Sequence, residues 1–452
     1  MTAVAGVSPA RRAAFQILLR MERASGHADD LLRGRKVSAL SAADRHLATA
    51  LVLGVLRWQL WLDQQIRAHL DRPNAKLEPE VRLALRMGVF QLLSLDRIPA
   101  HAAIDESVEL VKRAGHRFAS GMVNAVLRKV AQQETLHGHA ADAAAVEAHP
   151  AWMVERWIVQ FGEGAARTIC RHGQAQPEPV VRVESAEDEE EMARKGIELA
   201  PGTLLACARL VKAGDVTATA AFREGRVHLQ DEGSQLIAEL AATSLNRGQE
   251  KILDACAAPG GKARILAERL PRARILALEA SASRLALLRE RLAAYADRVE
   301  FRHADAAALE ETSAFDLALV DAPCSGTGTL GRNPEIRHRL RAEDLARHAE
   351  RQEAILRAAL RAVRPDGFVV YATCSLEPEE NEHVAAAVLA EMRDARQVSL
   401  APQIDTLLQR GILTHAGAER LRPCLTPEGA VRLIPGAVHT DGFFAALIEK
   451  KP

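Results

Sequence analysis

Two cysteines in the chain follow apolar segments, at the point where each segment gives way to a polar turn. Cys324 stands in Asp321-Ala-Pro-Cys-Ser-Gly-Thr-Gly328, directly after residues 315–320, and Cys374 follows residues 368–371. If both segments are parallel strands, the two thiols meet at one edge of a sheet. A thiol in a polar turn is accessible, and its thiolate is a strong nucleophile. The pattern favours covalent catalysis.

The other cysteines carry less information. Cys170, Cys207 and Cys256 are expected to be small buried apolar residues, as most unpaired cysteines are. No two of the six cysteines are spaced as Cys-x-x-Cys, so we expect no metal site. Six cysteines in 452 residues are too few for a disulfide scaffold, which points to a reducing, cytoplasmic setting.

A glycine-rich segment, Asp254-Ala-Cys-Ala-Ala-Pro-Gly-Gly-Lys262, separates a short predicted strand from a predicted helix. Gly260 and Gly261 let the backbone approach a ligand, and a helix N-terminus favours negative charge. The segment fits neither the P-loop nor the Gly-x-Gly-x-x-Gly pattern. Glu279 ends the next predicted strand and can accept hydrogen bonds from ribose hydroxyls, and Asp305 ends a third near an adenine. These residues together favour a nucleoside cofactor over a plain tight turn.

A thiol beside a methyl donor suits one reaction in particular. Carbon 5 of a pyrimidine is a poor nucleophile until a thiolate adds to carbon 6, and an acid near ring nitrogen 3 stabilises the adduct. Asp321 is the candidate acid, and a base must then remove the carbon 5 proton. Methylation of an amino group needs no thiol. This reasoning leaves open whether Cys324 or Cys374 is the nucleophile.

The first 130 residues predict an all-helical domain. Apolar residues recur at helical spacing over 13–19, 47–70, 81–95 and 104–111. Prolines stand between these segments, where they are tolerated better than inside a helix. Residues 134–148 lose this pattern and are expected to form a linker, after which a helix resumes over 151–158. Short apolar runs between 177 and 230 predict a small α+β insert.

From Lys251 onward, strand-like and helix-like segments alternate. The expected strands cover 252–253, 275–278, 315–320, 368–371 and 443–448, and the expected helices cover 263–270, 282–294 and 345–363. Such alternation predicts a doubly wound, Rossmann-like sheet with helices on both faces. We therefore expect a multidomain chain: an all-α domain over 1–135, an α+β subdomain over 148–235 and an α/β domain over 236–452.

Charge is distributed unevenly along a chain whose formal net charge is zero. Residues 1–130 carry a net charge of +8 and the remainder −8. A basic lobe is typical of polyanion binding, although a solvated basic helical surface explains the charge equally well. With 48% hydrophobic and 26% charged residues, the composition excludes wholesale disorder. No run of eighteen apolar residues predicts a membrane span.

The motifs resemble those of a known family. Residues 254–262, 321–328 and 371–381 are similar to the signature motifs of RNA cytosine-5 methyltransferases. The segments 96–107 and 124–128 resemble a NusB-like domain, and the combination is similar to the bacterial RsmB (Fmu/Sun) family, which methylates a cytosine in small-subunit ribosomal RNA. His149-Pro-Ala-Trp152 and 230–235 also match, so the resemblance spans nearly the whole chain.

The resemblance implies a cofactor, a partner and roles for named residues. S-adenosylmethionine would be held by Cys256, Ala257, Ala258, Pro259, Gly260, Gly261, Lys262, Glu279, Arg284, Asp305 and Asp321. Cys374 would be the nucleophile, Cys324 would assist product release, and the partner would be ribosomal RNA bound by a monomer. Two positions depart from the family: Glu279 replaces the usual Asp, and Glu184 replaces the usual Asn.

Two rivals to this interpretation stay open. A transfer RNA cytosine-5 methyltransferase would use the same chemistry, and the NusB-like segment argues against it by family analogy alone. A non-catalytic RNA-binding assembly factor would keep the fold, but both thiols, the acids and Lys262 are retained.

Overall fold

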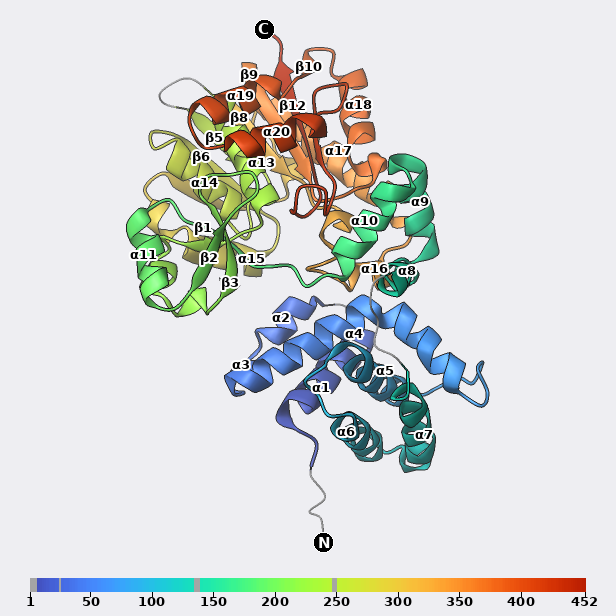
Figure 1. Ribbon diagram of the computed structural model, residues 1–452. Coiled ribbons are helices and arrows are strands. Elements are labelled where there is room, and N and C mark those ends of the chain that lie inside the picture. Colours follow the sequence, from blue (N-terminus) through green and yellow to red (C-terminus); the bar gives the residue numbers. More distant parts are fainter. Residues whose placement is uncertain (1–5, 24–25, 134–138, 246–249) are drawn as a thin grey trace. The chain divides into compact units, whose positions relative to one another are not determined.

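The computed structural model describes residues 6–23, 26–133, 139–245 and 250–452 (Figure 1). The chain forms two compact units. The first comprises Met1–Gln176 together with Leu330–Arg339, and the second comprises Pro177–Thr329 together with Leu340–Pro452. In the described residues, no helix is long and apolar enough to cross a membrane.

The first unit is helical, as the sequence predicts. Its helices are α1 (Pro9–Arg23), α2 (Ala28–Leu32), α3 (Arg35–Ser38), α4 (Ala42–His69), α5 (Pro79–Ser94), α6 (Ala100–Arg113), α7 (Ser120–Val130), α8 (His139–Glu147), α9 (Ala151–Phe161), α10 (Glu163–Gln174) and α16 (Ile336–Arg339). Ser41 caps α4 by accepting a hydrogen bond from the Asp44 amide, and Pro79 begins α5. A Cβ at Gly54 would lie 2.0 Å from the Phe90 ring, so glycine lets α4 and α5 pack closely.

The predicted linker over 134–148 is wrong in its second part. Residues 139–147 form α8, and 134–138 lie outside the described residues. The segment is rich in alanine, which has the highest helix propensity but adds little apolar periodicity. Ala144, Ala145 and Ala148 are buried, so tertiary packing stabilises a helix that the pattern did not signal.

A short segment of the later chain belongs to the first unit. Arg337 is fully buried and donates hydrogen bonds to the carbonyl oxygens of Arg57 (3.0 Å), Gly173 (3.0 Å) and Leu330 (3.3 Å). Arg57 in turn donates from Nε and Nη2 to the Gly331 carbonyl. These backbone contacts hold 330–339 in the helical unit. The three-domain boundaries expected from the sequence stay a prediction.

The second unit contains two sheets, of which the smaller is antiparallel. Its strand order is β2-β3-β1-β4, with bounds β1 (Val180–Arg182), β2 (Glu198–Pro201), β3 (Ala208–Ala213) and β4 (His228–Leu229). The helices α11 (Ala186–Arg194) and α12 (Ala220–Arg223) complete this subdomain around an apolar cluster that includes Val181, Met192 and Val227. The α+β insert is confirmed, and β2 and β3 are additions to it.

The larger sheet has eight strands. Their order is β10-β12-β9-β8-β5-β6-β7, with β11 beside β12. The strands are β5 (Lys251–Asp254), β6 (Arg274–Glu279), β7 (Val299–His303), β8 (Phe315–Asp321), β9 (Val363–Thr373), β10 (Ala395–Val398), β11 (Val431–Leu433) and β12 (Phe443–Lys450). The five strands β5 to β9 pair in parallel, whereas β10, β11 and β12 pair antiparallel.

Helices cover both faces of this sheet, which confirms the doubly wound architecture. They are α13 (Glu232–Thr243), α14 (Gly261–Arg269), α15 (Ala282–Arg291), α17 (Asp344–Ala362), α18 (Glu382–Glu391), α19 (Ala401–Gln409) and α20 (His415–Leu421). Alternate residues of β8 enter different apolar clusters: Leu317 and Leu319 face α13 and α14, while Ala318 and Val320 face α17. The parallel strands end at one edge, where the predicted site residues follow them.

Candidate active site

The two thiols that the sequence singled out are in contact. Cys324 Sγ lies 3.4 Å from Cys374 Sγ. Asp321 pairs in register with Ala372, so each cysteine follows its strand at nearly the same level. Gly328 then donates a hydrogen bond to the Cys374 carbonyl at 2.9 Å. A Cβ at Gly328 would lie 2.8 Å from that oxygen, so only glycine lets the two turns approach this closely.

The surroundings of Cys324 favour its neutral thiol. Its hydrogen bond with Cys374, its burial and the charge of Glu380 raise the pKa of Cys324 well above the usual value. A thiol that keeps its proton is a poor first nucleophile but can exchange a proton with a neighbour. Which of the two cysteines attacks the base stays a prediction.

Asp321 forms an ion pair with Lys262. Lys262 Nζ lies 2.7 Å from Asp321 Oδ2 and 5.5 Å from the centre of the Phe443 ring. Burial lowers the pKa of Lys262, but the charges of Asp321 and Cys374 outweigh it and raise the pKa above its usual value. The sequence-based hypothesis treated Asp321 as a lone acid, whereas the structure couples it to a cation.

Asp254, at the end of β5, is a buried carboxylate whose oxygens accept no close hydrogen bond from the described residues. Its side chain is 1% exposed, and neither oxygen has a hydrogen-bond partner among the described residues. Burial and the charge of Asp321 raise the pKa of Asp254 to about 7. A buried polar group without a partner is costly, which marks Asp254 as a place where a ligand would supply the missing donor.

The glycine-rich turn lies directly after Asp254. Gly260 has φ of +106°, a conformation that glycine adopts readily, and a Cβ there would lie 2.9 Å from Leu288. The helix α14 begins at Gly261 and leaves its first amide groups free to meet a ligand. Cys256 in this turn is partly exposed, unlike the buried residue expected; Cys170 and Cys207 are buried.

The acids at the next two strand ends differ in exposure. Glu279 is 6% exposed and accepts a hydrogen bond from the Ser281 amide at 2.9 Å. Arg284 approaches Glu279 at 3.5 Å and donates to the Ala258 carbonyl at 2.7 Å, which ties the glycine-rich turn to β6. Asp305 is exposed and pairs with Arg351 at 3.2 Å. A bound ligand must compete with Arg351 for Asp305.

These residues fit the cofactor that the resemblance implies. Three acidic side chains stand at the ends of the neighbouring strands β5, β6 and β7 or just beyond them, and Asp254 has two unsatisfied acceptor oxygens. Such acceptors match an amino group and ribose hydroxyls.

Glu184, the second departure from the family pattern, pairs with arginines. Arg269 Nη2 lies 2.8 Å from Glu184, and Arg182 also contacts it. Arg182 and Arg269 also bind the buried Glu239, at 2.7 Å and 2.9 Å respectively. Together with Cys207 these carboxylates form a cluster that could suit a metal ion by composition, but two arginines already balance its charge. The cluster joins the α+β insert to α13 and α14.

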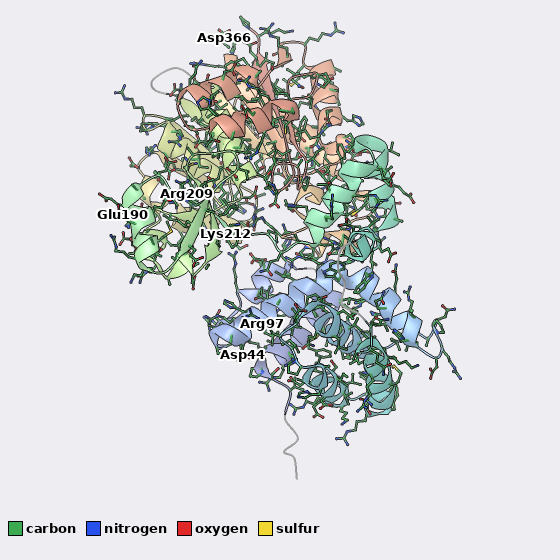
Figure 2. All side chains as sticks on the ribbon, in the orientation of Figure 1. Asp44, Arg97, Glu190, Arg209, Lys212 and Asp366 are labelled. Atoms are coloured by element: carbon green, nitrogen blue, oxygen red, sulfur yellow. The ribbon has the colours of Figure 1, made fainter. Side chains whose placement is uncertain are left out.

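Charged side chains on the small sheet are also paired within the chain. Arg209 and Lys212 extend from β3 (Figure 2) and bind Glu189 at 2.9 Å and Glu178 at 2.6 Å. Pairing of this kind reduces the attraction that these cations offer to a polyanion.

One buried carboxylate near the thiols escaped the sequence reasoning. Glu380, within the motif over 371–381, accepts hydrogen bonds from Ser325 and Ser375, which directly follow the two cysteines. An acidic residue between two apolar segments was the only hint in the sequence that a carboxylate is buried here. The spacing of the residues does not show which donors surround it.

Comparisons with known proteins agree with this geometry. A family described as 16S rRNA methyltransferase RsmB/F matches residues 242–449, and the NusB family matches residues 8–132. The chain is 32% identical to the probable ribosomal RNA small subunit methyltransferase B of Bacillus subtilis over 461 residues, covering 98% of each chain. It is 34% identical to ribosomal RNA small subunit methyltransferase B of Xanthomonas campestris, covering 99% of this chain and 98% of that one. The fold resembles the crystal structure of PH0851, with a TM-score of 0.78 and 23% identity over 99% of this chain and 100% of that one.

Proposed function

Because the chain belongs to the RsmB/F family of 16S rRNA methyltransferases, which are cytosine-5 RNA methyltransferases, we propose that it methylates its cytosine through a covalent bond from Cys374. The observation that carries this proposal is the contact between Cys324 and Cys374, 3.4 Å apart beside an acceptor-lined turn. Methylation at carbon 5 of cytosine needs a nucleophile that adds to carbon 6, whereas methylation at nitrogen or oxygen does not.

S-adenosylmethionine is the methyl donor in this proposal. It supplies an electrophilic methyl group on a sulfonium centre. Asp254 would accept from its amino group and Glu279 from its ribose hydroxyls, and the turn over 256–262 would lie against the nucleoside. Arg284 keeps Glu279 and the turn together, and Asp305 would border the adenine.

The side chains around the thiols divide the work on the base. The target cytosine is extruded from its RNA into the site, as enzymes acting on a base require. The Cys374 thiolate adds to carbon 6, and the electron pair moves through the ring toward nitrogen 3, which takes a proton from the Lys262–Asp321 pair. Carbon 5 is then nucleophilic enough to take the methyl group.

Release requires two bonds to break. The carbon 5 proton leaves to a base, the double bond reforms, and the Cys374–carbon 6 bond breaks with sulfur keeping the electron pair. Nitrogen 3 then returns its proton to the Lys262–Asp321 pair, which restores the neutral base. Cys324, which favours its protonated form and contacts Cys374, is positioned to return a proton to the departing thiolate. The proposed nucleophile and release group are thus in contact.

The helical unit would hold the ribosomal RNA through its excess of basic residues. Arg12, Arg20, Arg35 and Lys36 are exposed on α1 and α3. Phosphate contacts by such residues position RNA without reading its sequence. Base selection then falls to the methyltransferase unit.

The test is an analysis of the product. Purified protein is incubated with 16S rRNA, with transfer RNA in a parallel reaction, and with methyl-labelled S-adenosylmethionine, and the RNA is digested to nucleosides. We expect label in 5-methylcytidine from 16S rRNA only. Label in transfer RNA supports the transfer RNA alternative, and binding of RNA without label supports a non-catalytic assembly factor; either result contradicts the proposal.

A further inference from the structure

Both cysteine turns are held by one carboxylate. Glu380 is fully buried, and its Oε1 accepts hydrogen bonds from the Ser325 amide at 2.8 Å and from Gln352 Nε2 at 3.0 Å. Its Oε2 accepts from the Ser375 hydroxyl at 2.5 Å and from the Ser325 hydroxyl. Ser325 and Ser375 each follow a cysteine directly, so one side chain joins two turns that are fifty residues apart in sequence.

Further contacts make this arrangement rigid. The two serine hydroxyls lie 3.0 Å apart, and Gln352 also donates to the Pro323 carbonyl at 3.0 Å. Tyr371, on the strand that leads to Cys374, donates to the Glu380 carbonyl at 2.5 Å. Glu380 is therefore fixed by its main chain as well as by its side chain. All its donors in the described part of the chain are uncharged.

A buried carboxylate with only neutral partners is costly to keep, because its desolvation is not repaid by an opposite charge. A serine or threonine pair could join two turns at less cost. Glu380 instead receives four donors at once, which fixes the direction of both turns, and charge-assisted bonds are shorter and stronger than neutral ones. The cost is explicable if the position of the two thiols matters to the reaction.

We propose that Glu380 is a positioning residue that acts through Ser325 and Ser375 to hold Cys324 and Cys374 in contact. It would act through the two serines and not by contact with the cofactor or the base. The inference rests on the proposed function, because the contact of the thiols matters only if one attacks the base and the other assists release. The charge of Glu380 also raises the pKa of Cys324, which agrees with a release role for that thiol.

The geometry of the thiols can be measured without RNA. Phenylarsine oxide binds two thiols that lie close together: arsenic forms two bonds to sulfur and its oxygen leaves as water with the two thiol protons. We expect the wild-type protein to bind one equivalent at this pair, and the Cys324→Ala variant supplies the background from the other thiols. The Glu380→Ala variant should bind at least about tenfold more weakly, because all four hydrogen bonds that hold the two turns are lost.

The conservative variant separates the connection from the charge. In Glu380→Gln the amide oxygen can still accept from the Ser325 amide and Gln352, while the amide nitrogen donates to the two hydroxyls, which can act as acceptors. Arsenical binding should therefore stay within about threefold of the wild type. The matched control is Glu391→Gln on α18, where Glu391 pairs with Arg357 at the surface, and it should change nothing.

A functional readout accompanies the arsenical measurement. The single-turnover rate of methyl transfer should fall at least about tenfold in Glu380→Ala and be largely restored in Glu380→Gln, with the cofactor dissociation constant unchanged in both. If Glu380→Ala does not unfold cooperatively, Ser375→Ala removes one connection and should weaken arsenical binding about threefold to tenfold. Wild-type arsenical binding in Glu380→Ala, or in Ser375→Ala where that variant replaces it, overturns the inference. A wild-type protein that binds the arsenical but methylates no RNA overturns the proposed function alone.

Discussion

Two neighbouring regions of the large sheet each contain a buried carboxylate, and the two carboxylates differ in the hydrogen bonds that they accept. At the ends of β8 and β9, Glu380 receives four hydrogen bonds from the chain itself. At the end of β5, Asp254 is equally buried and receives none among the described residues. A protein leaves few buried polar groups unpaired. The difference separates a group that builds the site from a group that awaits a ligand.

The same contrast extends to the basic residues of the helical unit. Arg33 on the α2–α3 turn pairs with Asp29 at 2.8 Å, whereas exposed Arg35, two residues later, has no carboxylate within ion-pair distance in the described ranges. Arg337, which is fully buried, donates from Nη1 and Nη2 to backbone carbonyls and serves the fold, although its Nε has no partner among the described residues. We expect RNA to use exposed cations such as Arg35, and the cofactor to use Asp254.

Removal of the ribose-binding acid should give the largest change in cofactor binding. Glu279→Ala loses charge-assisted hydrogen bonds of roughly 1.5–3 kcal/mol, so the dissociation constant for S-adenosylmethionine should rise about tenfold to a hundredfold. Isothermal titration calorimetry measures this. RNA binding and arsenical binding at the thiols should be unaffected, and Glu300→Ala on the exposed side of β7 is the matched control. An unchanged titration would remove Glu279 from the cofactor site.

Asp254 should make stability depend on pH. Its pKa of about 7 in the folded protein lies above the ordinary value of 3.8, so the folded state holds a proton that the unfolded state has lost between these values. The free energy of unfolding should therefore fall as pH rises from 4 to 7, by up to about 1.4 kcal/mol per pH unit relative to Asp254→Asn.

Denaturant titrations of both proteins at several pH values test this dependence. Asp305→Asn is the matched control, because Asp305 is exposed. Saturating S-adenosylmethionine should make the stability of the wild type depend less on pH. The reason is that the positively charged amino group of the cofactor favours the ionised form of Asp254. If the free energy of unfolding varies with pH in the same way for the wild type and Asp254→Asn, the pKa of Asp254 is not raised in the folded protein.

The smallest expected effect concerns single surface cations. Arg35→Ala should weaken RNA binding only a few-fold and reduce the slope of affinity against salt concentration by about one ion. Arg33→Ala should change less, because Asp29 already neutralises that cation. Filter binding of a 16S rRNA fragment at several salt concentrations measures both. If RNA affinity depends on salt concentration equally in Arg35→Ala and in the wild type, Arg35 makes no phosphate contact and the basic residues of α3 only interact with solvent.

The sequence predicted the elements that carry strong local patterns. Continuous apolar runs marked β8 and β9, and the polar residues after them identified Cys324, Cys374 and Asp321 at one edge. Parallel strands signal themselves in this way because both their faces are buried. The family resemblance added the cofactor and the partner.

Features that depend on distant backbone contacts were not predictable. Arg337 binds carbonyl oxygens, which every residue has, so no sequence pattern signals that 330–339 belongs with the helices. The four donors of Glu380 come together only when three separate segments are folded. Helix α8 lacked the apolar period because alanine fills its buried face.

The most direct test of the central claim separates the two thiols on one denaturing gel. Cys324→Ala and Cys374→Ala are each incubated with 16S rRNA fragment and S-adenosylmethionine, then denatured. If Cys374 adds to carbon 6 and Cys324 assists release, Cys324→Ala accumulates a protein–RNA adduct that is absent from Cys374→Ala and from the double variant. An adduct in Cys374→Ala would contradict the assignment of the nucleophile, and no adduct in either variant would contradict the release role of Cys324.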